Sequence, residues 1–327
     1  MKKNIAVVMG GFSSEFAISL KSGETVLKNL PADKYEAYPI VITKEDWFYE
    51  HNGQRISVDK NDFSITLNGK KILFDAVFNA IHGTPGEDGI LPAYWEMLGI
   101  PHTSSDYDKM ALTFNKKYTL SVVKSYGIPV ARSVFLHEND RINPDEIIEK
   151  TGLPLIVKPN KAGSSYGISL VKSADELMPA IEKAFAEDKE ILIEEYIEGR
   201  EFSIGVIKLN GKTEVLPVTE IIPENEFFDY EAKYLGKARE ITPAEIDDRE
   251  RKILTETAKR VYEVLDLSGV SRAEYILRDG VPYFLEINMV PGLTEASILP
   301  QQVRAAGKTL PEIFTDIIEN AIKKHKR

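Results

Sequence analysis

The chain has 327 residues, 43% hydrophobic and 28% charged, which is enough for two or three folded domains. Its 41 basic and 51 acidic residues give a net charge of −10, which disfavours binding to nucleic acid or to an anionic membrane surface. The sequence contains no cysteine, so it excludes disulfides and thiolate chemistry and suits a reducing compartment. We therefore expect a cytoplasmic protein without nucleic-acid or membrane partners.

The first third of the sequence predicts a parallel sheet flanked by helices. An apolar run over residues 4–9 predicts a strand, and a Gly10-Gly11 turn leads from it into a helix over residues 14–30. The dipeptides Asn52-Gly53 and Asn68-Gly69 predict two hairpins beside the main sheet. The other elements expected here are strands over 35–43 and 75–80 and helices over 90–98 and 107–126.

Shorter elements follow Pro129 and predict a separate small α+β unit. The expected elements of this unit are strands over 130–136, 153–158, 168–171 and 191–197 and helices over 144–150 and 174–186. The elements expected after it are strands over 202–209 and 214–218, a helix over 244–265, a hairpin over 270–288 and helices over 299–306 and 310–323. The polar stretch 223–243 is long for a compact domain, and is therefore either functional or disordered.

A candidate phosphate-binding loop lies between two strands of the small unit. The sequence lacks both the G-x-x-x-x-G-K-[ST] and the G-x-G-x-x-G patterns. Instead, Lys158 ends a strand and small residues continue as far as Gly167. Backbone N–H groups in such a loop can approach phosphate oxygens while the lysine offsets their charge. A solvated glycine-serine hairpin explains the same residues, so both interpretations stay open.

The expected 270–288 hairpin carries a candidate metal site. Arg272 and Glu274 lie on its first strand and Glu286 and Asn288 on its second, and carboxylate and amide oxygens are ligands that suit Mg²⁺. A two-residue turn at Asp279-Gly280 would put the two glutamates on opposite faces, whereas a three-residue turn would pair them. We predict the three-residue turn, because apolar residues surround Glu286 and because paired carboxylates need a cation between them.

Two glycine-rich turns in the first third also follow strands and precede helices. Glu15 ends the turn that begins at Gly10, where a carboxylate suits the helix dipole with or without a ligand. His82 opens the turn that runs to Gly89, and a lone histidine is more often structural than catalytic. Neither turn identifies a site by itself.

Taken together and in this order, these segments resemble the D-alanine:D-alanine ligases of the ATP-grasp superfamily. The resemblance runs from about residue 4 to about residue 320 and is most specific at residues 10–15, 82–89, 158–167, 229–235 and 286–294. It implies α/β and α+β architecture, with an ATP-grasp fold behind an N-terminal Rossmann-like domain. The implied domains are 1–110 (Rossmann-like), 111–200 (central ATP-grasp) and 201–327 (C-terminal ATP-grasp with the metal site).

The resemblance also assigns nucleotide and metal roles. ATP would lie between the central and C-terminal subdomains, and two Mg²⁺ ions, with Mn²⁺ as a substitute, would accompany it. The residues matched to the phosphates are Lys116, Lys158, Ser164, Ser165 and Lys233; those matched to adenine and ribose are Glu194, Glu195, Ile197 and Glu201; those matched to the metal are Glu274, Glu286 and Asn288. Glu195 replaces a frequent lysine and Glu274 a commoner aspartate.

The implied substrates are ATP and two D-alanine molecules, and the implied assembly is a homodimer. The residues matched to the reacting groups are Glu15, Ser164 and Tyr234 over the first substrate, Ser297 at the carboxylate of the second, Arg272 and the Gly292 N–H as charge-stabilising donors, and His82 near the acyl phosphate. D-alanyl-D-alanine would serve peptidoglycan synthesis. The alternatives are another ATP-grasp ligase, for example a D-alanine:D-serine ligase, and a regulatory nucleotide-binding protein without turnover.

Overall fold

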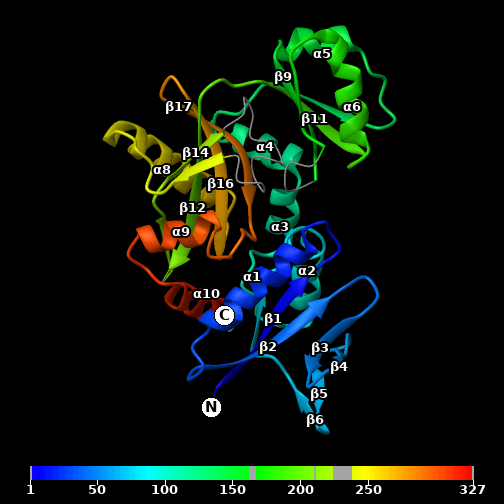
Figure 1. The fold of residues 1–327 in the computed structure, drawn as a ribbon, viewed down its shortest axis with the longest axis vertical. Helices are drawn as coiled ribbons and strands as arrows, with labels where there is room; N and C mark the ends of the chain where they lie inside the picture. Colours follow the sequence, from blue (N-terminus) through cyan, green and yellow to red (C-terminus); the bar gives the residue numbers. More distant parts are fainter. Residues whose placement is uncertain (1, 162–166, 210, 224–237, 326–327) are drawn as a thin grey trace.

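The computed structural model describes residues 2–161, 167–209, 211–223 and 238–325 (Figure 1). This described part is built on a five-stranded N-terminal sheet, a four-stranded central sheet and a six-stranded C-terminal sheet, with a small two-stranded hairpin beside the first. Both parallel and antiparallel pairings occur, as the predicted combination of α/β and α+β architecture requires. None of the described helices is long and apolar enough to cross a membrane.

The N-terminal sheet has the strand order β4-β3-β2-β1-β7, with β1 parallel to both β2 and β7. Because parallel strands end at the same edge, the loop after β1 and the loop after β7 lie next to each other. The predicted hairpins at Asn52-Gly53 and Asn68-Gly69 are confirmed. The elements of this part are β1 (Lys3–Gly10), α1 (Phe16–Asn29), β2 (Tyr35–Ile42), β3 (Trp47–His51), β4 (Gln54–Ser57), β5 (Ile65–Leu67), β6 (Lys70–Ile72), β7 (Ala76–Asn79) and α2 (Ile90–Met97).

Asn115 divides the predicted helix 107–126 into α3 (Tyr107–Phe114) and α4 (Lys116–Ser125). Its backbone is extended (φ −93°, ψ 102°), and its side chain accepts a hydrogen bond from the N–H of Tyr118 as the N-cap of α4. The Asn160 amide donates to the Asn115 side chain over 3.0 Å. The prediction of one helix was therefore wrong, and the break ties the first turn of α4 to the central sheet.

The central sheet has the order β10-β9-β11-β8, and all its pairings are antiparallel. Two helices pack on one face, where Leu155, Leu177, Ile181 and Ile193 form a buried cluster. The predicted helix 174–186 begins as a single 3₁₀ turn at Ala174–Glu176. The elements of this part are β8 (Ser133–His137), α5 (Pro144–Thr151), β9 (Leu155–Pro159), β10 (Ser169–Val171), α6 (Leu177–Phe185) and β11 (Glu190–Glu195).

The C-terminal sheet has the order β15-β14-β12-β16-β17, with β13 beside β12. The predicted strand 214–218 was wrong in its bounds: β13 ends at Val215 and β14 begins at Thr219. The predicted helix 244–265 begins later, because Asp247 and Glu250 form a capping box that fixes its first turn. The elements are β12 (Arg200–Leu209), β13 (Lys212–Val215), β14 (Thr219–Pro223), β15 (Ala238–Ile241), α8 (Asp248–Val264), β16 (Val270–Arg278), β17 (Val281–Asn288), α9 (Ile298–Ala305) and α10 (Leu310–His325).

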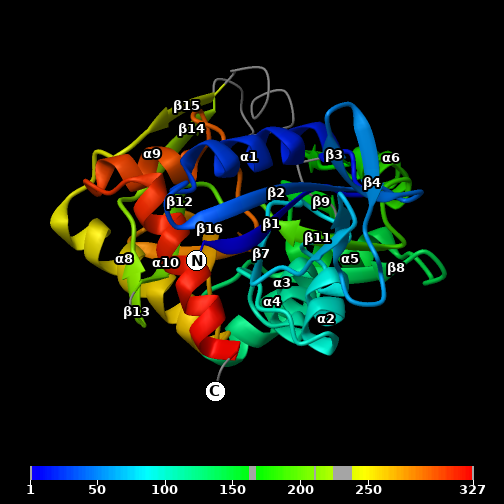
Figure 2. The ribbon, with the colours of Figure 1, turned by 90° about the horizontal axis from the view of Figure 1, so that it is seen from below.

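The last helix, α10, packs against both the first and the third sheet. Its Phe314 ring meets Phe78 of β7 edge to face at a centroid distance of 5.1 Å. Ile5 and Val7 of β1 belong to the same buried cluster as Ile207 of β12. Figure 2 shows α10 (red) against the N-terminal strands (blue). The two ends of the chain thus share one hydrophobic core.

Candidate active site

Two cavities meet at Glu286. One has a volume of about 340 Å³ and lies between the glycine-rich loops of the N-terminal sheet, the α3–α4 junction and residues 286–298. The other, of about 290 Å³, lies between the central and C-terminal sheets. Both cavities are walled by sequence-predicted site residues. These residues are Glu15, His82, Lys116, Arg272, Glu286, Asn288, Gly292 and Ser297 in the first cavity and Lys158, Glu194, Glu195, Ile197, Glu201, Glu274 and Glu286 in the second.

The β16–β17 hairpin pairs Glu274 with Glu286 and Arg272 with Asn288. This pairing was predicted, but the predicted three-residue turn was wrong. Asp279 and Gly280 both have positive φ (53° and 75°), which defines a two-residue type I′ turn. A bulge between Glu274 and Tyr275 then shifts the register, and Leu285 is the extra residue on β17.

Cationic side chains hold the two paired carboxylates. The Arg272 Nη1 lies 2.6 Å from Glu274 Oε1 and 2.9 Å from Ser203 Oγ. The Lys116 Nζ lies 3.2 Å from Glu286 Oε2. Burial lowers the pKa of Arg272, but the carboxylates of Glu274 and Glu286 raise it by more, so the guanidinium stays charged. The site therefore combines anionic ligands with fixed positive charge.

The cavity between the sheets is lined by both apolar and charged side chains. Ile156, Ile276 and Leu285 supply apolar surface of the kind that suits a planar base. The Nζ of Lys158 on β9 lies 2.5 Å from the Oε2 of Glu194 on β11. Burial lowers the pKa of Lys158, but the carboxylates of Glu194, Glu286 and Glu274 raise it by more, and the net shift is upward.

Glu195 points its carboxylate at Arg132 rather than leaving it free. The backbone N–H and the Nε–H of Arg132 each donate to it over 2.8 Å. The replacement of the lysine frequent at this position therefore has a local explanation: the side chain secures the segment that enters β8. The backbone of Glu195 accordingly becomes the better candidate for an adenine contact.

Both ring nitrogens of His82 are engaged by the protein. Nδ1 lies 2.7 Å from the carbonyl oxygen of Val290, and Nε2 lies 2.9 Å from Ser22 Oγ. Because a carbonyl can only accept, Nδ1 carries the proton and Nε2 accepts from the serine. Burial lowers the pKa of His82 despite the nearby Glu15 carboxylate, so the ring is neutral.

Glu87 is a buried site residue to which the sequence analysis gave no role. Its Oε1 accepts hydrogen bonds from the N–H groups of Met289 (2.9 Å) and Val290 (3.2 Å), and its Oε2 accepts one from Gly83 (3.1 Å). Burial and the Glu15 carboxylate raise the pKa of Glu87 to about 7, against the effect of these three donors. An acidic residue inside a glycine-rich turn was a signal, but its partners lie 202 and 203 residues later in the chain.

Ser297 is the N-cap of α9, and its hydroxyl lies 2.8 Å from that of Thr294. Gly292 lies close to this serine, since a Cβ at position 292 would lie 2.8 Å from Ser297 Oγ. A larger residue at position 292 would therefore require the Ser297 side chain or the backbone to move. Both residues line the first cavity.

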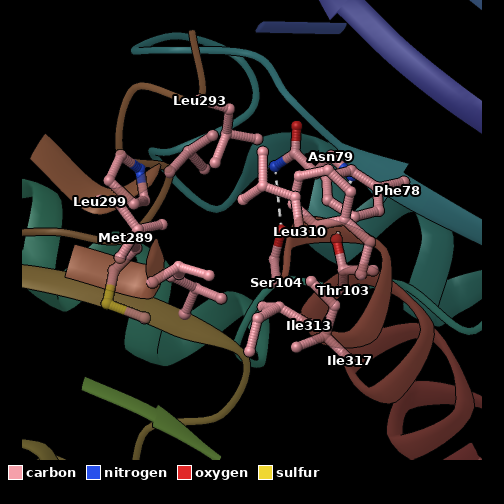
Figure 3. Close-up of a pocket in the computed structure, with 15 residues that line it drawn as sticks. Phe78, Asn79, Thr103, Ser104, Met289, Leu293, Leu299, Leu310, Ile313 and Ile317 are labelled. Carbon is pink, nitrogen blue, oxygen red and sulfur yellow. Dashed lines mark hydrogen bonds between the residues drawn. The ribbon is translucent and has the colours of Figure 1, made fainter. Parts of the chain in front are cut away.

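Figure 3 shows the apolar surface behind this segment. Met289 and Leu293 line a cavity of about 30 Å³ together with Phe78 of β7 and Ile313 of α10, which is room for about one water molecule. The Asn79 side chain closes one side with a hydrogen bond of 2.9 Å to Ser104. The segment 289–293 is thus packed from behind with little free space.

Four predicted site residues lie outside the described residues. They are Ser164, Ser165, Lys233 and Tyr234. The greater part of the polar stretch over residues 223–243 also lies there.

Comparison with known proteins agrees with this architecture. The D-ala D-ala ligase N-terminus family matches residues 4–105, and the D-ala D-ala ligase C-terminus family matches residues 122–319. Among solved structures, a D-Ala:D-Ser ligase from Enterococcus faecalis (VanG) superposes with a TM-score of 0.86 at 32% identity, covering 98% of this chain and 100% of that one. A D-alanine–D-alanine ligase from Bacillus anthracis complexed with ATP superposes with a TM-score of 0.80 at 30% identity, covering 99% of both chains.

The fold and the two joined cavities define a ligase of the ATP-grasp class. The curated relatives narrow this further. The D-alanine–D-alanine ligase of Flavobacterium johnsoniae is 56% identical over 97% of this chain and 98% of its own length, and that of Christiangramia forsetii is 50% identical over 98% and 99%. The chain belongs to the D-alanine–D-alanine ligase family.

Proposed function

We propose that this enzyme uses ATP to join two D-alanine molecules into D-alanyl-D-alanine for peptidoglycan synthesis. One observation carries the proposal beyond family membership. The Glu274–Glu286 and Arg272–Asn288 pairs stand at the meeting point of two cavities. The cavity between the sheets suits a nucleotide, and the cavity beside Glu15 and Ser297 suits two small zwitterions.

The proposed roles follow the division into residues 1–110, 111–200 and 201–327. ATP lies between the second and third domains, with its base against the apolar walls and its phosphates near Lys158 and Lys116. The net positive charge that Lys158 keeps in its buried position supports this role. Ser164, Ser165 and Lys233 are proposed as further phosphate ligands, and Glu194, Glu195, Ile197 and Glu201 as contacts to adenine and ribose.

Glu274, Glu286 and Asn288 are the proposed Mg²⁺ ligands, with Mn²⁺ as a substitute. The donor set fits a hard cation, since it offers two facing carboxylates and an amide. The side-chain nitrogen of Asn288 is buried without a hydrogen-bond partner among the described residues; as a donor it suits a phosphate oxygen of the nucleotide, while the amide oxygen is the atom that can bind the cation. When bound, the metal supplies positive charge to the phosphates of the nucleotide.

The proposed chemistry has two steps. The carboxylate oxygen of the first D-alanine attacks the γ-phosphorus, a P–O bond forms, and ADP leaves with the electrons of the broken P–O bond. The amine of the second D-alanine then attacks the carbonyl carbon, a C–N bond forms, and inorganic phosphate leaves while the nitrogen loses a proton. Arg272 and the Gly292 N–H stabilise the oxyanion of this second step.

The remaining roles concern the substrates. Glu15, Ser164 and Tyr234 orient the first D-alanine, and Ser297 holds the carboxylate of the second. His82 lines the same cavity, but both of its ring nitrogens are hydrogen-bonded to Val290 and Ser22. We therefore propose that it stabilises the backbone near the acyl phosphate and does not react with it.

A product assay tests the proposed function. Purified enzyme is supplied with ATP, Mg²⁺ and D-alanine, with and without D-serine or D-lactate, and products are identified by mass spectrometry. We expect D-alanyl-D-alanine and one ADP per product. We also expect little D-alanyl-D-lactate at pH 7, because Tyr234 matches the tyrosine of amino-acid-accepting ligases. Preferential formation of D-alanyl-D-serine would instead favour the alternative ligase.

We further propose that the enzyme is a cytoplasmic homodimer. Ile90 and Met97, seven residues apart on one face of α2, are 58% and 87% exposed, so this face presents apolar surface that a partner subunit could cover. Sedimentation analysis at micromolar concentration tests the assembly. Met97→Glu should shift a dimer toward monomer, whereas Glu24→Gln on the exposed face of α1 should not.

A further inference from the structure

The segment 289–293 connects two proposed catalytic groups, Asn288 at its start and the Gly292 N–H near its end. Its backbone is held mainly by side chains of the N-terminal domain. Glu87 accepts from the N–H groups of Met289 and Val290 through a single oxygen, Oε1. Since its other oxygen accepts from Gly83, Glu87 joins the loop after β7 to the strand end that carries the metal ligands.

His82 and Ser22 hold the other half of the segment. The Leu293 N–H donates to Ser22 Oγ over 3.3 Å, the Ser22 hydroxyl donates to His82 Nε2, and His82 Nδ1 donates to the Val290 carbonyl. These bonds form a closed bridge from residue 290 to residue 293, across Gly292. Each member of the bridge is buried, so water does not compete for the bonds.

We propose that Glu87 is a positioning residue for the ligase reaction, and that together with the His82–Ser22 bridge it fixes the direction of the Gly292 N–H. Side chains of the N-terminal domain hydrogen-bond to four backbone groups of the segment: the N–H groups of residues 289, 290 and 293 and the carbonyl of residue 290. On its other side, the segment packs around the cavity of about 30 Å³ that Phe78 and Ile313 also line. The proposal rests on the proposed function for its effect on turnover.

A direct role of Glu87 in the chemistry is less consistent with the geometry. Both carboxylate oxygens are occupied by backbone donors of the protein, and the side chain belongs to a residue that is 8% exposed. A group that binds the first D-alanine would chiefly affect its KM. A group that orients an oxyanion donor would chiefly affect kcat, because that donor acts in the transition state.

The test compares Glu87→Ala with Glu87→Gln and with Leu91→Ala. Glutamine keeps an acceptor oxygen for Met289 and Val290 and loses the bond to Gly83, so we expect a kcat within about fivefold of wild type, the scale of one hydrogen bond. Alanine removes all three bonds, and we expect kcat to fall by about 10²-fold, the scale of a small misplacement of catalytic groups, with the KM for ATP nearly unchanged. Leu91, buried in α2, is a matched control that should lower Tm but not kcat.

Hydrogen–deuterium exchange gives a readout that is independent of turnover. Peptides covering residues 286–294 should exchange faster in Glu87→Ala, while peptides covering 270–278 should not change. If Glu87→Ala does not fold, Ser22→Ala serves instead, since it removes one backbone anchor; its kcat should fall about fivefold and the same peptide should exchange faster.

Three results would overturn the positioning role. They are Glu87→Gln as inactive as Glu87→Ala, a loss confined to the KM of D-alanine, and unchanged exchange over residues 286–294. A wild-type enzyme that makes no D-alanyl-D-alanine would contradict the proposed function instead, and the exchange result would remain readable.

Discussion

At the scale of single residues, Arg272 shows how the site is prepared before substrate binds. Its guanidinium is held by Glu274 and Ser203 and is only 8% exposed. A donor that is already oriented costs no reorganisation when negative charge develops. Because the contact with Arg272 also restrains Glu274, we expect a change at Arg272 to affect this proposed metal ligand as well.

We expect Arg272→Ala to lower kcat by about 10²-fold or more, the usual effect of removing one oxyanion donor, with little change in the dissociation constant of ATP. Steady-state kinetics and nucleotide titration measure the two quantities. Ser203→Ala is the matched control, since it removes only the 2.9 Å contact and should cost about tenfold or less. If Arg272→Ala changes only the KM for ATP, the residue serves the nucleotide and the oxyanion assignment is wrong.

Gly292 supplies a second prediction at this scale. Alanine there would bring its Cβ to 2.8 Å from Ser297 Oγ, so the serine or the backbone must move. We expect the KM for the second D-alanine to rise and kcat to fall by about tenfold or more. Gly280→Ala is a control for a glycine change remote from substrate: no atom lies within 4 Å of a Cβ at that position, but the φ of 75° strains the turn, so this change should lower Tm and leave the KM for D-alanine unchanged. Equal effects of the two changes on the KM for D-alanine would contradict the Ser297 assignment.

At the scale of secondary structure, the bulge in the β16–β17 hairpin serves both cavities. It keeps Glu274 opposite Glu286, and the extra residue, Leu285, lines the cavity between the central and C-terminal sheets together with Ile276. A regular strand would point the consecutive residues Leu285 and Glu286 to opposite faces, whereas in the bulged strand both line this cavity.

We therefore expect Leu285→Ala to raise the KM for ATP by about fivefold while kcat stays close to wild type. The estimate corresponds to losing about 1 kcal/mol of apolar contact from a half-buried side chain. Enzyme kinetics at saturating D-alanine measures it. Val281→Ala, near the turn and 37% exposed, controls for general weakening of the hairpin. A large fall in kcat would mean that Leu285 maintains the bulge itself.

The same hairpin shows how much of the structure could be predicted from the sequence. The pairing of the two glutamates was predictable, because the apolar residues around Glu286 indicate a side chain that faces a site, and a cation between the two carboxylates would offset their repulsion. The bulge that produces this pairing was not predictable, because Asp279-Gly280 favours a two-residue turn and the register changes only farther along the hairpin, between Glu274 and Tyr275. Likewise the break at Asn115 depends on Asn160, and the role of Glu87 depends on Met289 and Val290. Local patterns identified most of the elements, and the resemblance named residues that line the two cavities, whereas contacts between distant segments decided these details.

At the scale of the whole molecule, the buried His102 should make the folded protein less stable in acid. Its side chain is 6% exposed and its ring lies 5.7 Å from that of Trp95. Burial lowers the pKa of His102 to about 4, although the Asp106 carboxylate raises it. The unfolded chain, with a histidine pKa near 6.5, therefore binds more protons than the native protein between about pH 6.5 and pH 4.

It follows that the free energy of unfolding should decrease as pH falls through this window, by up to about 1.4 kcal/mol per pH unit from this group. His102→Gln, which does not titrate, should show a shallower decline. Urea unfolding of both proteins at several pH values between 4.5 and 7 measures the difference. Parallel pH dependences would show that His102 is protonated equally in the two states.

The shared core beneath α10 also has a consequence for how the protein is made. Because β1 and β7 precede α10 in the chain, the ribosome synthesises their sheet before Phe314 and its neighbours, which cover it. At about ten residues per second, roughly twenty seconds separate β7 from α10. During that interval the nascent chain carries an uncovered apolar sheet. A ribosome stalled shortly before residue 310 should therefore present a chain that binds chaperones and is cleaved by protease within the N-terminal sheet.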